Sequence, residues 1–120
     1  MRLISFDIDG TMEFGDPPGP IPVGWVRAAQ ADGFLVGSAS DRTVTGQRKL
    51  WEDAGIKLDF VVLKHTIDQL KGRFGADEYW HVGDTEMDRH FATHAGFTFF
   101  WAAGFTEKEF GRDGHVPQGS

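Results

Sequence analysis

The sequence predicts a three-layer α/β fold, in which a central parallel sheet of five strands has helices on both faces. Short apolar runs alternate along the chain with segments of helical periodicity, a pattern typical of βαβ units. The length of 120 residues suits one domain built around a single core. Polar residues follow the apolar runs, where the carboxyl ends of parallel strands would meet.

We expect the strands, in chain order, at residues 2–6, 34–37, 60–63, 80–82 and 98–101. The helices are expected between and after them, at residues 23–31, 42–54, 66–74, 88–95 and, shorter, 107–110. In the second helix Val44, Leu50 and Trp51 follow helical spacing, and Gly55 then ends it as a C-terminal glycine. The segment 15–20, Gly-Asp-Pro-Pro-Gly-Pro, must be a stiff loop because helices and strand ladders both reject so many prolines.

We expect one domain over residues 1–110, followed by a flexible tail over residues 111–120 that has few apolar side chains. The formal charge of −6 argues against charge-driven binding to nucleic acid. The chain has no cysteine, which excludes disulfides and thiolate metal sites and favours a cytoplasmic location. No apolar stretch approaches the length of a membrane span, so a membrane partner is not expected.

The most informative segment lies directly behind the first predicted strand. Asp7 and Asp9 are two residues apart, so both side chains can project from the same side of the strand's end. Two carboxylates this close repel each other unless a cation or a proton lies between them. Gly10 then allows the backbone to leave the strand sharply. The segment is either the start of a site or an Asx turn, in which Asp and Gly are also common.

Three further predicted strands end in residues of matching chemistry. Ser38 follows the second strand, Lys64 follows the third, and Asp84 and Asp88 follow the fourth. In open α/β sheets the ligand crevice lies beyond the carboxyl ends of the strands, so these side chains would face one crevice together with Asp7. The carboxylates suit Mg²⁺, and the serine and lysine suit the oxygens of a phosphate.

With these residues in this order, the chain resembles the phosphatase branch of the haloacid dehalogenase (HAD) superfamily. The segment 7–11 (Asp-Ile-Asp-Gly-Thr) looks like its first motif and the segment 83–88 (Gly-Asp-Thr-Glu-Met-Asp) like its acidic fourth. Ser38 resembles the hydroxyl of the second motif and Lys64 the lysine of the third. The resemblance covers residues 3–101 and implies a Rossmann-like (HAD-like) fold.

The resemblance also implies a reaction: Mg²⁺-dependent hydrolysis of phosphomonoesters through an aspartyl-phosphate intermediate. Asp7 would be the nucleophile, and Asp9 the general acid and then the general base. The carboxylate of Asp7, the backbone carbonyl of Asp9 and Asp84 would hold the metal. The dehalogenases of this superfamily lack a second acid at the position of Asp9, so its presence favours phosphoryl transfer.

Thr11, Ser38 and Lys64 would hold the phosphate oxygens, and Asp88 would orient Lys64 or a metal-bound water. Two of these assignments have alternatives in the sequence. Lys71 lies seven residues beyond Lys64, although it falls inside a helical pattern rather than after a strand. Ser40 is the alternative to Ser38.

Relatives in this superfamily often carry a cap domain, for which this chain has no room. Only about ten residues separate the first motif from the helix beginning near Val23, and Lys64 follows its strand at once. The resemblance is therefore to the capless group, which implies either a macromolecular substrate or a homo-oligomer that closes the site around a small one. The loop 15–20 is either a rigid flap over the crevice or a plain connector.

Two other functions are consistent with the same residues. One is a catalytically silent HAD-like module used for binding or assembly, which the intact set of acidic and basic residues disfavours. The other is a polynucleotide or sugar phosphatase of the same superfamily, of which the negative charge disfavours the polynucleotide form.

Overall fold

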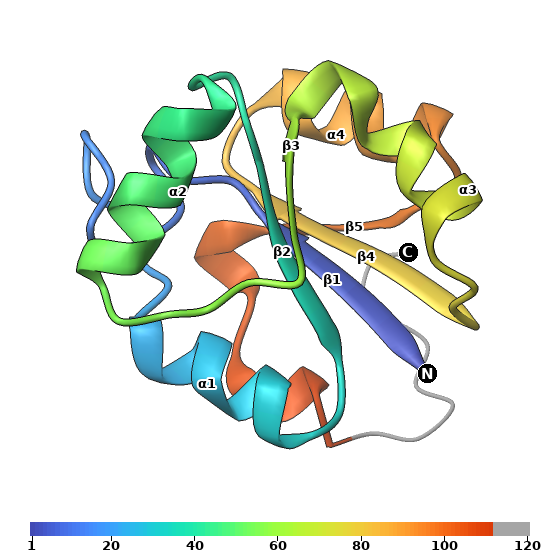
Figure 1. Cartoon of the computed structure of the whole chain (residues 1–120), viewed down its shortest axis with the longest axis horizontal. Helices are drawn as coiled ribbons and strands as arrows, with labels where there is room; N and C mark the ends of the chain where they lie inside the picture. The colour runs from blue at the N-terminus through green and yellow to red at the C-terminus, as the bar shows by residue number, and fades with distance from the viewer. Residues whose placement is uncertain (112–120) are drawn as a thin grey trace.

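The computed structural model describes residues 1–111 and has a parallel sheet between two layers of helices (Figure 1). Its strands are β1 (Arg2–Phe6), β2 (Leu35–Ser40), β3 (Phe60–Leu63), β4 (Glu78–Gly83) and β5 (Thr98–Trp101). They lie in the order β3-β2-β1-β4-β5, and all neighbouring strands run parallel. The predicted three-layer α/β fold with a five-stranded sheet is confirmed. The expected tail lies outside the described residues, apart from Gly111.

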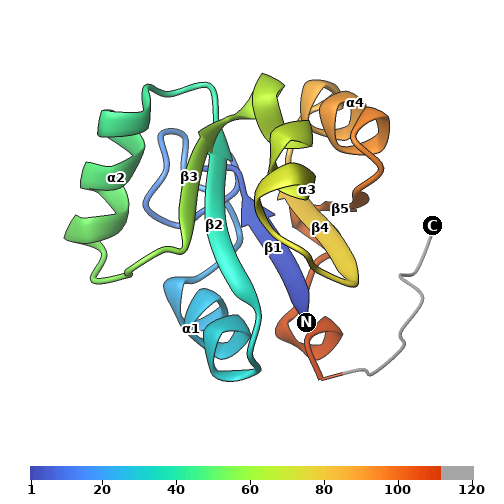
Figure 2. The same ribbon diagram turned by 45° about the vertical axis from the view of Figure 1, so that its right-hand side comes forward.

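The helices are α1 (Val23–Ala31), α2 (Val44–Asp53), α3 (Leu70–Arg73) and α4 (Glu86–His94), with short 3-10 helices η1 (Lys64–Gln69), η2 (Ala102–Gly104) and η3 (Glu107–Glu109). Helices α1 and α2 cover one face of the sheet, and α3 and α4 cover the other (Figure 2). Each layer has its own apolar cluster against the sheet. Between residues 1 and 111, no helix is long and apolar enough to cross a membrane.

The central strand β1 determines where the middle of the sheet's carboxyl edge lies. Its side chains alternate between the faces, so Ile4 and Phe6 belong to the core beneath α1 and α2, while Leu3 belongs to the core beneath α3 and α4. Burial on both faces explains why this run is almost continuously apolar. The residues that follow Phe6 therefore emerge between the ends of β2 and β4.

The predicted bounds of β1, β3, β5 and α1 are confirmed. Strand β4 is longer than predicted by two residues at its start and one at its end, α2 is shorter by two and one, and β2 also differs. It continues to Ser40, three residues past the predicted end at Gly37, so the prediction that Ser38 follows the strand is wrong. Gly37 looks like a turn residue in the sequence, yet it is needed inside the sheet. A Cβ at Gly37 would lie 2.2 Å from the ring of Phe60 on the neighbouring β3.

The helix predicted over residues 66–74 is replaced by two shorter ones. The chain turns directly from β3 into the 3-10 helix η1, which has a kink at Thr66 (φ −108°, ψ 15°), and continues into α3. Helix α4 begins at Glu86, two residues earlier than predicted, because Thr85 and Asp88 form a capping box at its start. These two helix starts place Lys64 and Asp88 at the carboxyl edge of the sheet.

Candidate active site

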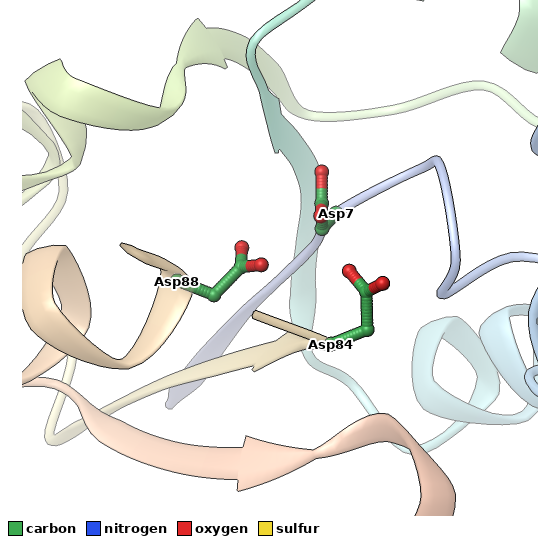
Figure 3. Close-up of side chains that lie close together, drawn as sticks. All are labelled: Asp7, Asp84 and Asp88. Carbon is green, nitrogen blue, oxygen red and sulfur yellow. The ribbon is translucent and has the colours of Figure 1, made fainter. Parts of the chain in front are cut away.

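Three carboxylates meet at the carboxyl edge of the sheet. Asp7 follows β1, Asp84 follows β4, and Asp88 lies in the first turn of α4, and their side chains point toward one another (Figure 3). One carboxylate oxygen from each lies within 4.8 Å of the others. Asp7 is held there by the sheet itself, since its amide donates to the carbonyl of Val82 at 3.0 Å and extends the pairing of β1 with β4. The structure thus brings together Asp7 and Asp84, the predicted carboxylate ligands of a metal.

Asp7 is buried, with 4% of its surface exposed. Burial raises the pKa of Asp7 from 3.8 to about 8, and the charge of Asp88 acts in the same direction, against the opposing charge of Lys64. Even beside Lys64, therefore, the carboxyl group of Asp7 keeps its proton at neutral pH when no metal ion is bound. A divalent cation beside it would favour the carboxylate form and relieve the repulsion within the cluster.

Lys64 is the cation that the structure places against this cluster. Its Nζ lies 3.2 Å from Asp7 Oδ2, 3.2 Å from Asp88 Oδ1 and 3.6 Å from Asp41 Oδ2. Burial disfavours its charged form, but Asp7 and Asp88 outweigh this, so the pKa of Lys64 is raised and the side chain remains an ammonium. The alternative, Lys71, donates to the carbonyl of Gly96 at 3.3 Å, away from Asp7.

Asp88 belongs to the cluster, and both of its carboxylate oxygens contact donors from the protein. Its Oδ1 accepts from His81 Nε2 at 2.8 Å and pairs with Lys64 at 3.2 Å, while its Oδ2 accepts from the amide and hydroxyl of Thr85 at 3.2 and 2.7 Å. The protein's own donors therefore engage both oxygens of this carboxylate. Burial would raise the pKa of Asp88, but His81, Lys64 and Thr85 together lower it. His81 is in turn bonded to Ser5, at 2.6 Å between Oγ and Nδ1.

Asp88 contacts Lys64, one of the two groups that it is predicted to orient, from a fully buried position. Its carboxylate lies over Gly83, the last residue of β4, where a Cβ would come within 2.2 Å of Asp88 Cγ. The buried chain from Ser5 through His81 to Asp88 was not predicted. Ser5 and His81 alternate with apolar residues in β1 and β4, which gives no sequence signal for a polar contact between strands.

Asp84 lies against the first motif. Thr11, which is fully buried, directs its hydroxyl toward Asp84 Oδ1 at 3.4 Å. Gly10 adopts a left-handed conformation (φ 74°), and a Cβ there would lie 1.9 Å from Asp84 Oδ2. The turn after β1 therefore leaves space for Asp84 only because residue 10 is glycine. Thr11 holds Asp84, which is a different contact from the phosphate contact expected for it.

Asp9, the predicted acid and base, is bound by a residue that the sequence did not reveal. The guanidinium of Arg42 donates to both carboxylate oxygens, with Nε 2.9 Å from Oδ2 and Nη2 2.9 Å from Oδ1. The backbone amide of Asp16 adds a bond of 2.9 Å to Oδ1. Although burial opposes it, these bonds and the charge of Arg42 lower the pKa of Asp9. Arg42 lies two residues after the end of β2 at Ser40. The predicted end at Gly37 is five residues before Arg42, so the prediction did not place Arg42 at the end of the strand.

The two serines of β2 occupy different places. Ser38 lies inside the strand and donates its hydroxyl to Gln47 Oε1 on α2 at 2.7 Å, within the buried core. Ser40 is the last residue of the strand, and its Oγ accepts from the amide of Arg42 at 3.1 Å. Ser40 lies two residues nearer the carboxyl edge of the sheet than Ser38, and this position favours Ser40 as the serine of the site.

The loop 15–20 folds back onto the first motif and is more than a connector. The carbonyl of Pro17 accepts from the amide of Gly10 at 2.7 Å, and the amide of Gly19 donates to the carbonyl of Met12 at 2.9 Å. A Cβ at Gly19 would lie 2.3 Å from the backbone of Thr11. The loop is therefore closely packed against the motif, and through Asp16 it helps to position Asp9.

The donor set fits a hard divalent cation such as Mg²⁺. Asp7 and Asp84 supply carboxylate oxygens, and no residue within 1–111 donates a hydrogen bond to the backbone carbonyl of Asp9. Asp84 is exposed, so water could complete an octahedral shell. These three groups are the ones that the resemblance implies for the metal.

Comparisons with known proteins add no identity to this geometry. No protein-family model matches the chain, and no curated protein matches its sequence.

Proposed function

We propose that this chain is a Mg²⁺-dependent phosphatase of the HAD type, which hydrolyses phosphomonoesters through a phosphorylated Asp7. The main support is the meeting of Asp7, Asp84 and Lys64 at one point, although they follow three different strands. A buried carboxylate nucleophile, a second carboxylate for a metal and a cation for phosphate oxygens are the groups that this chemistry needs.

In the proposed reaction an oxygen of Asp7 attacks phosphorus, and the bond from phosphorus to the ester oxygen breaks. Protonated Asp9 gives its proton to the departing oxygen. A water molecule then attacks the phosphoryl group and loses a proton to Asp9, the bond between Asp7 and phosphorus breaks, and inorganic phosphate leaves. Bound Mg²⁺ would offset negative charge on the phosphoryl oxygens. Lys64 and, in place of Ser38, Ser40 are the proposed protein ligands of those oxygens.

Asp9 and Arg42 have to separate in this scheme. Arg42 favours the charged carboxylate of Asp9, whereas proton donation needs the neutral acid. A guanidinium binds a phosphoryl group through two parallel hydrogen bonds as readily as it binds a carboxylate. We therefore propose that the phosphate of the substrate binds Arg42 and breaks its ion pair with Asp9. Asp9 then becomes protonated only when substrate is present.

The proposal is tested by hydrolysis of p-nitrophenyl phosphate with Mg²⁺ and after chelation by EDTA. Turnover is expected with Mg²⁺, and Asp7→Asn should abolish it because an amide cannot form the acyl phosphate. Asp53→Asn is the matched control, since Asp53 is exposed on α2 and pairs with Lys49. Metal-independent turnover, or full turnover by Asp7→Asn, would contradict the mechanism.

One observation favours the alternative of a silent binding or assembly module. The resting pair of Asp9 with Arg42 opposes the role of Asp9 as an acid, and a module without catalysis needs no such role. Folded, Mg²⁺-binding protein that hydrolyses no phosphoester in a broad panel would support this alternative. The expected homo-oligomer or macromolecular substrate remains a prediction, which a solution mass measurement and the same panel would test.

A further inference from the structure

His81 is buried in the middle of the sheet, and both nitrogens of its ring are bonded. It lies in β4 with none of its surface exposed, and its Nδ1 is 2.6 Å from the hydroxyl of Ser5 on the neighbouring β1. Its Nε2 donates to Oδ1 of Asp88 at 2.8 Å. Two bonds satisfy the imidazole, as burial requires. One of them, however, leads into the candidate active site, because the same oxygen of Asp88 lies 3.2 Å from Lys64.

Asp88 is the carboxylate that can accompany Lys64 through the whole proposed reaction. Two other carboxylates, those of Asp7 and Asp41, also lie near the ammonium. Asp7 becomes an acyl phosphate in that reaction, so it no longer pairs with Lys64 as a carboxylate. The side chain of Asp41 is 81% exposed, and water weakens its attraction for the ammonium. The place of Asp88 Oδ1 therefore determines where the ammonium lies while the phosphoryl group is bound.

The carboxylate of Asp88 also lies within reach of the proposed metal. One of its oxygens is within 4.8 Å of an oxygen from both Asp7 and Asp84 (Figure 3). A divalent cation attracts a nearby carboxylate, so the cation and Lys64 compete for Asp88. His81 favours Lys64, since it binds the oxygen that Lys64 contacts. Burial raises the pKa of Asp88, but the pKa is lowered overall, and the hydrogen bond from His81 is the largest cause that lowers it.

We infer that His81 is a positioning residue for phosphate binding: it holds Asp88 against Lys64 and away from the metal, so that the ammonium stays directed at the phosphoryl oxygens. This inference rests on the proposed function, because it takes the phosphoryl group to bind beside Asp7 and Lys64. The hydroxyl of Ser5 bonds Nδ1 of the ring, which leaves the proton on Nε2 facing Asp88.

Two amide variants separate the two sides of the ring. Glutamine places an amide nitrogen near the position of Nε2 and can donate to Asp88, whereas asparagine reaches only the position of Nδ1, beside Ser5. In the presence of Mg²⁺, calorimetry should show a Kd for inorganic phosphate roughly tenfold above wild type in His81→Asn, since the bond that fixes Asp88 is lost. His81→Gln should stay within about threefold of wild type. Equal losses in the two variants overturn the inference.

A milder variant and an exposed control accompany this pair. Ser5→Ala removes one hydroxyl and keeps the imidazole, so it should raise the Kd for phosphate about threefold by loosening the ring. His90→Asn makes the same substitution on the exposed face of α4 and should leave the Kd unchanged. Wild-type affinity for phosphate in both Ser5→Ala and His81→Asn overturns the inference.

Binding of Mg²⁺ distinguishes positioning from general damage. The ion is proposed to bind Asp7 and Asp84, whereas the bonds of His81 are to Ser5 and Asp88. The Kd for Mg²⁺ in His81→Asn should therefore be unchanged or lower, because Asp88 is then freer to approach the cation. A rise in the Kd for both Mg²⁺ and phosphate would mean that the substitution disrupts the whole edge of the sheet, which overturns the positioning role.

A double-mutant cycle tests whether the effect acts through Lys64. In the Lys64→Ala background, His81→Asn should change the Kd for phosphate less than about twofold, because the group that His81 positions is gone. An undiminished tenfold loss in that background overturns the inference.

Turnover of p-nitrophenyl phosphate separates this inference from the proposed function. Hydrolysis by the wild type, together with equal phosphate affinities in wild type and both His81 variants, overturns the positioning role and leaves the phosphatase in place. The expected pattern of phosphate and Mg²⁺ affinities without hydrolysis of any ester overturns the phosphatase and leaves His81 as a positioning residue of an anion site.

Discussion

The ammonium of Lys64 lies 3.2 Å from the carboxylate of Asp7, and both side chains are almost fully buried. A paired charge in such a place is costly to bury and is retained where the charge is used. The same ammonium is 3.2 Å from Asp88, so Lys64 is fixed between two carboxylates. One of these is the proposed nucleophile, and the other is bonded to His81 and Thr85.

Replacing Lys64 should impair catalysis far more than replacing Lys71. Lys64→Ala is expected to lower kcat by roughly a hundredfold or more, since it removes a charged donor to the phosphoryl oxygens. Lys71→Ala removes a contact with the carbonyl of Gly96 and should leave kcat within about twofold. Steady-state kinetics decide this, with circular dichroism as a check on folding. Full turnover by Lys64→Ala together with loss in Lys71→Ala would reverse the assignment.

Mg²⁺ affinity should rise with pH up to about 8, where Asp7 loses its proton in the metal-free protein. Below that pH, binding of the ion has to displace a proton, so calorimetry at pH 7 in buffers of different ionisation enthalpy should detect proton release. Asp7→Asn should abolish the release. Equal heats in the two buffers would indicate that Asp7 is already ionised before the metal binds.

The same raised pKa predicts how Asp7 affects stability without metal. A group whose folded pKa exceeds its unfolded pKa stabilises the fold fully below the unfolded value of 3.8, and this contribution is lost as pH rises through about 8. The free energy of unfolding of Asp7→Asn, measured relative to wild type in EDTA, should therefore increase between pH 5 and pH 8. Urea denaturation at both pH values provides the comparison, and a constant difference would contradict it.

Arg42→Ala should change the pH dependence of hydrolysis. The pKa of Asp9 in the free protein is lowered by Arg42, so its removal should move the alkaline limb of the kcat/KM profile to higher pH. KM should also rise, because the phosphate loses a guanidinium ligand. Arg42→Lys keeps the positive charge but cannot form the bidentate hydrogen bonds, so its pH profile of kcat/KM should lie between those of wild type and Arg42→Ala. An unmoved alkaline limb in Arg42→Ala would mean that Asp9 is not the acid.

Gly19→Ala should destabilise the fold by about 1–3 kcal/mol, because the new methyl group would overlap the backbone of Thr11. Gly72→Ala is the matched control, since nothing lies within 4 Å of a Cβ at that position in α3. It should leave stability unchanged or raise it slightly, because alanine favours helix more than glycine does. Thermal or urea unfolding of both variants compares the two sites. Equal stabilities would mean that the loop is loosely packed.

The fold was predictable where an apolar run ended sharply, as at β1, whose bounds follow directly from burial on two faces. The end of β2 was not, because Gly37 and Ser38 are small and look like loop residues until Phe60 and Gln47 fill the space around them. The site residues Asp7 and Asp9 were predictable as well, because two carboxylates directly after a buried strand are visible in the local sequence.

Arg42 had no such signal, since its partner Asp9 is 33 residues away. Lys64, by contrast, was identifiable from its position directly after a strand.

The glycine at position 83 makes the site unusually intolerant of variation at one backbone position. Even the methyl group of alanine would displace the carboxylate that anchors Lys64, and relaxing that anchor would also release His81 and the start of α4. In a library with every amino acid at this position, selection for activity should return glycine alone.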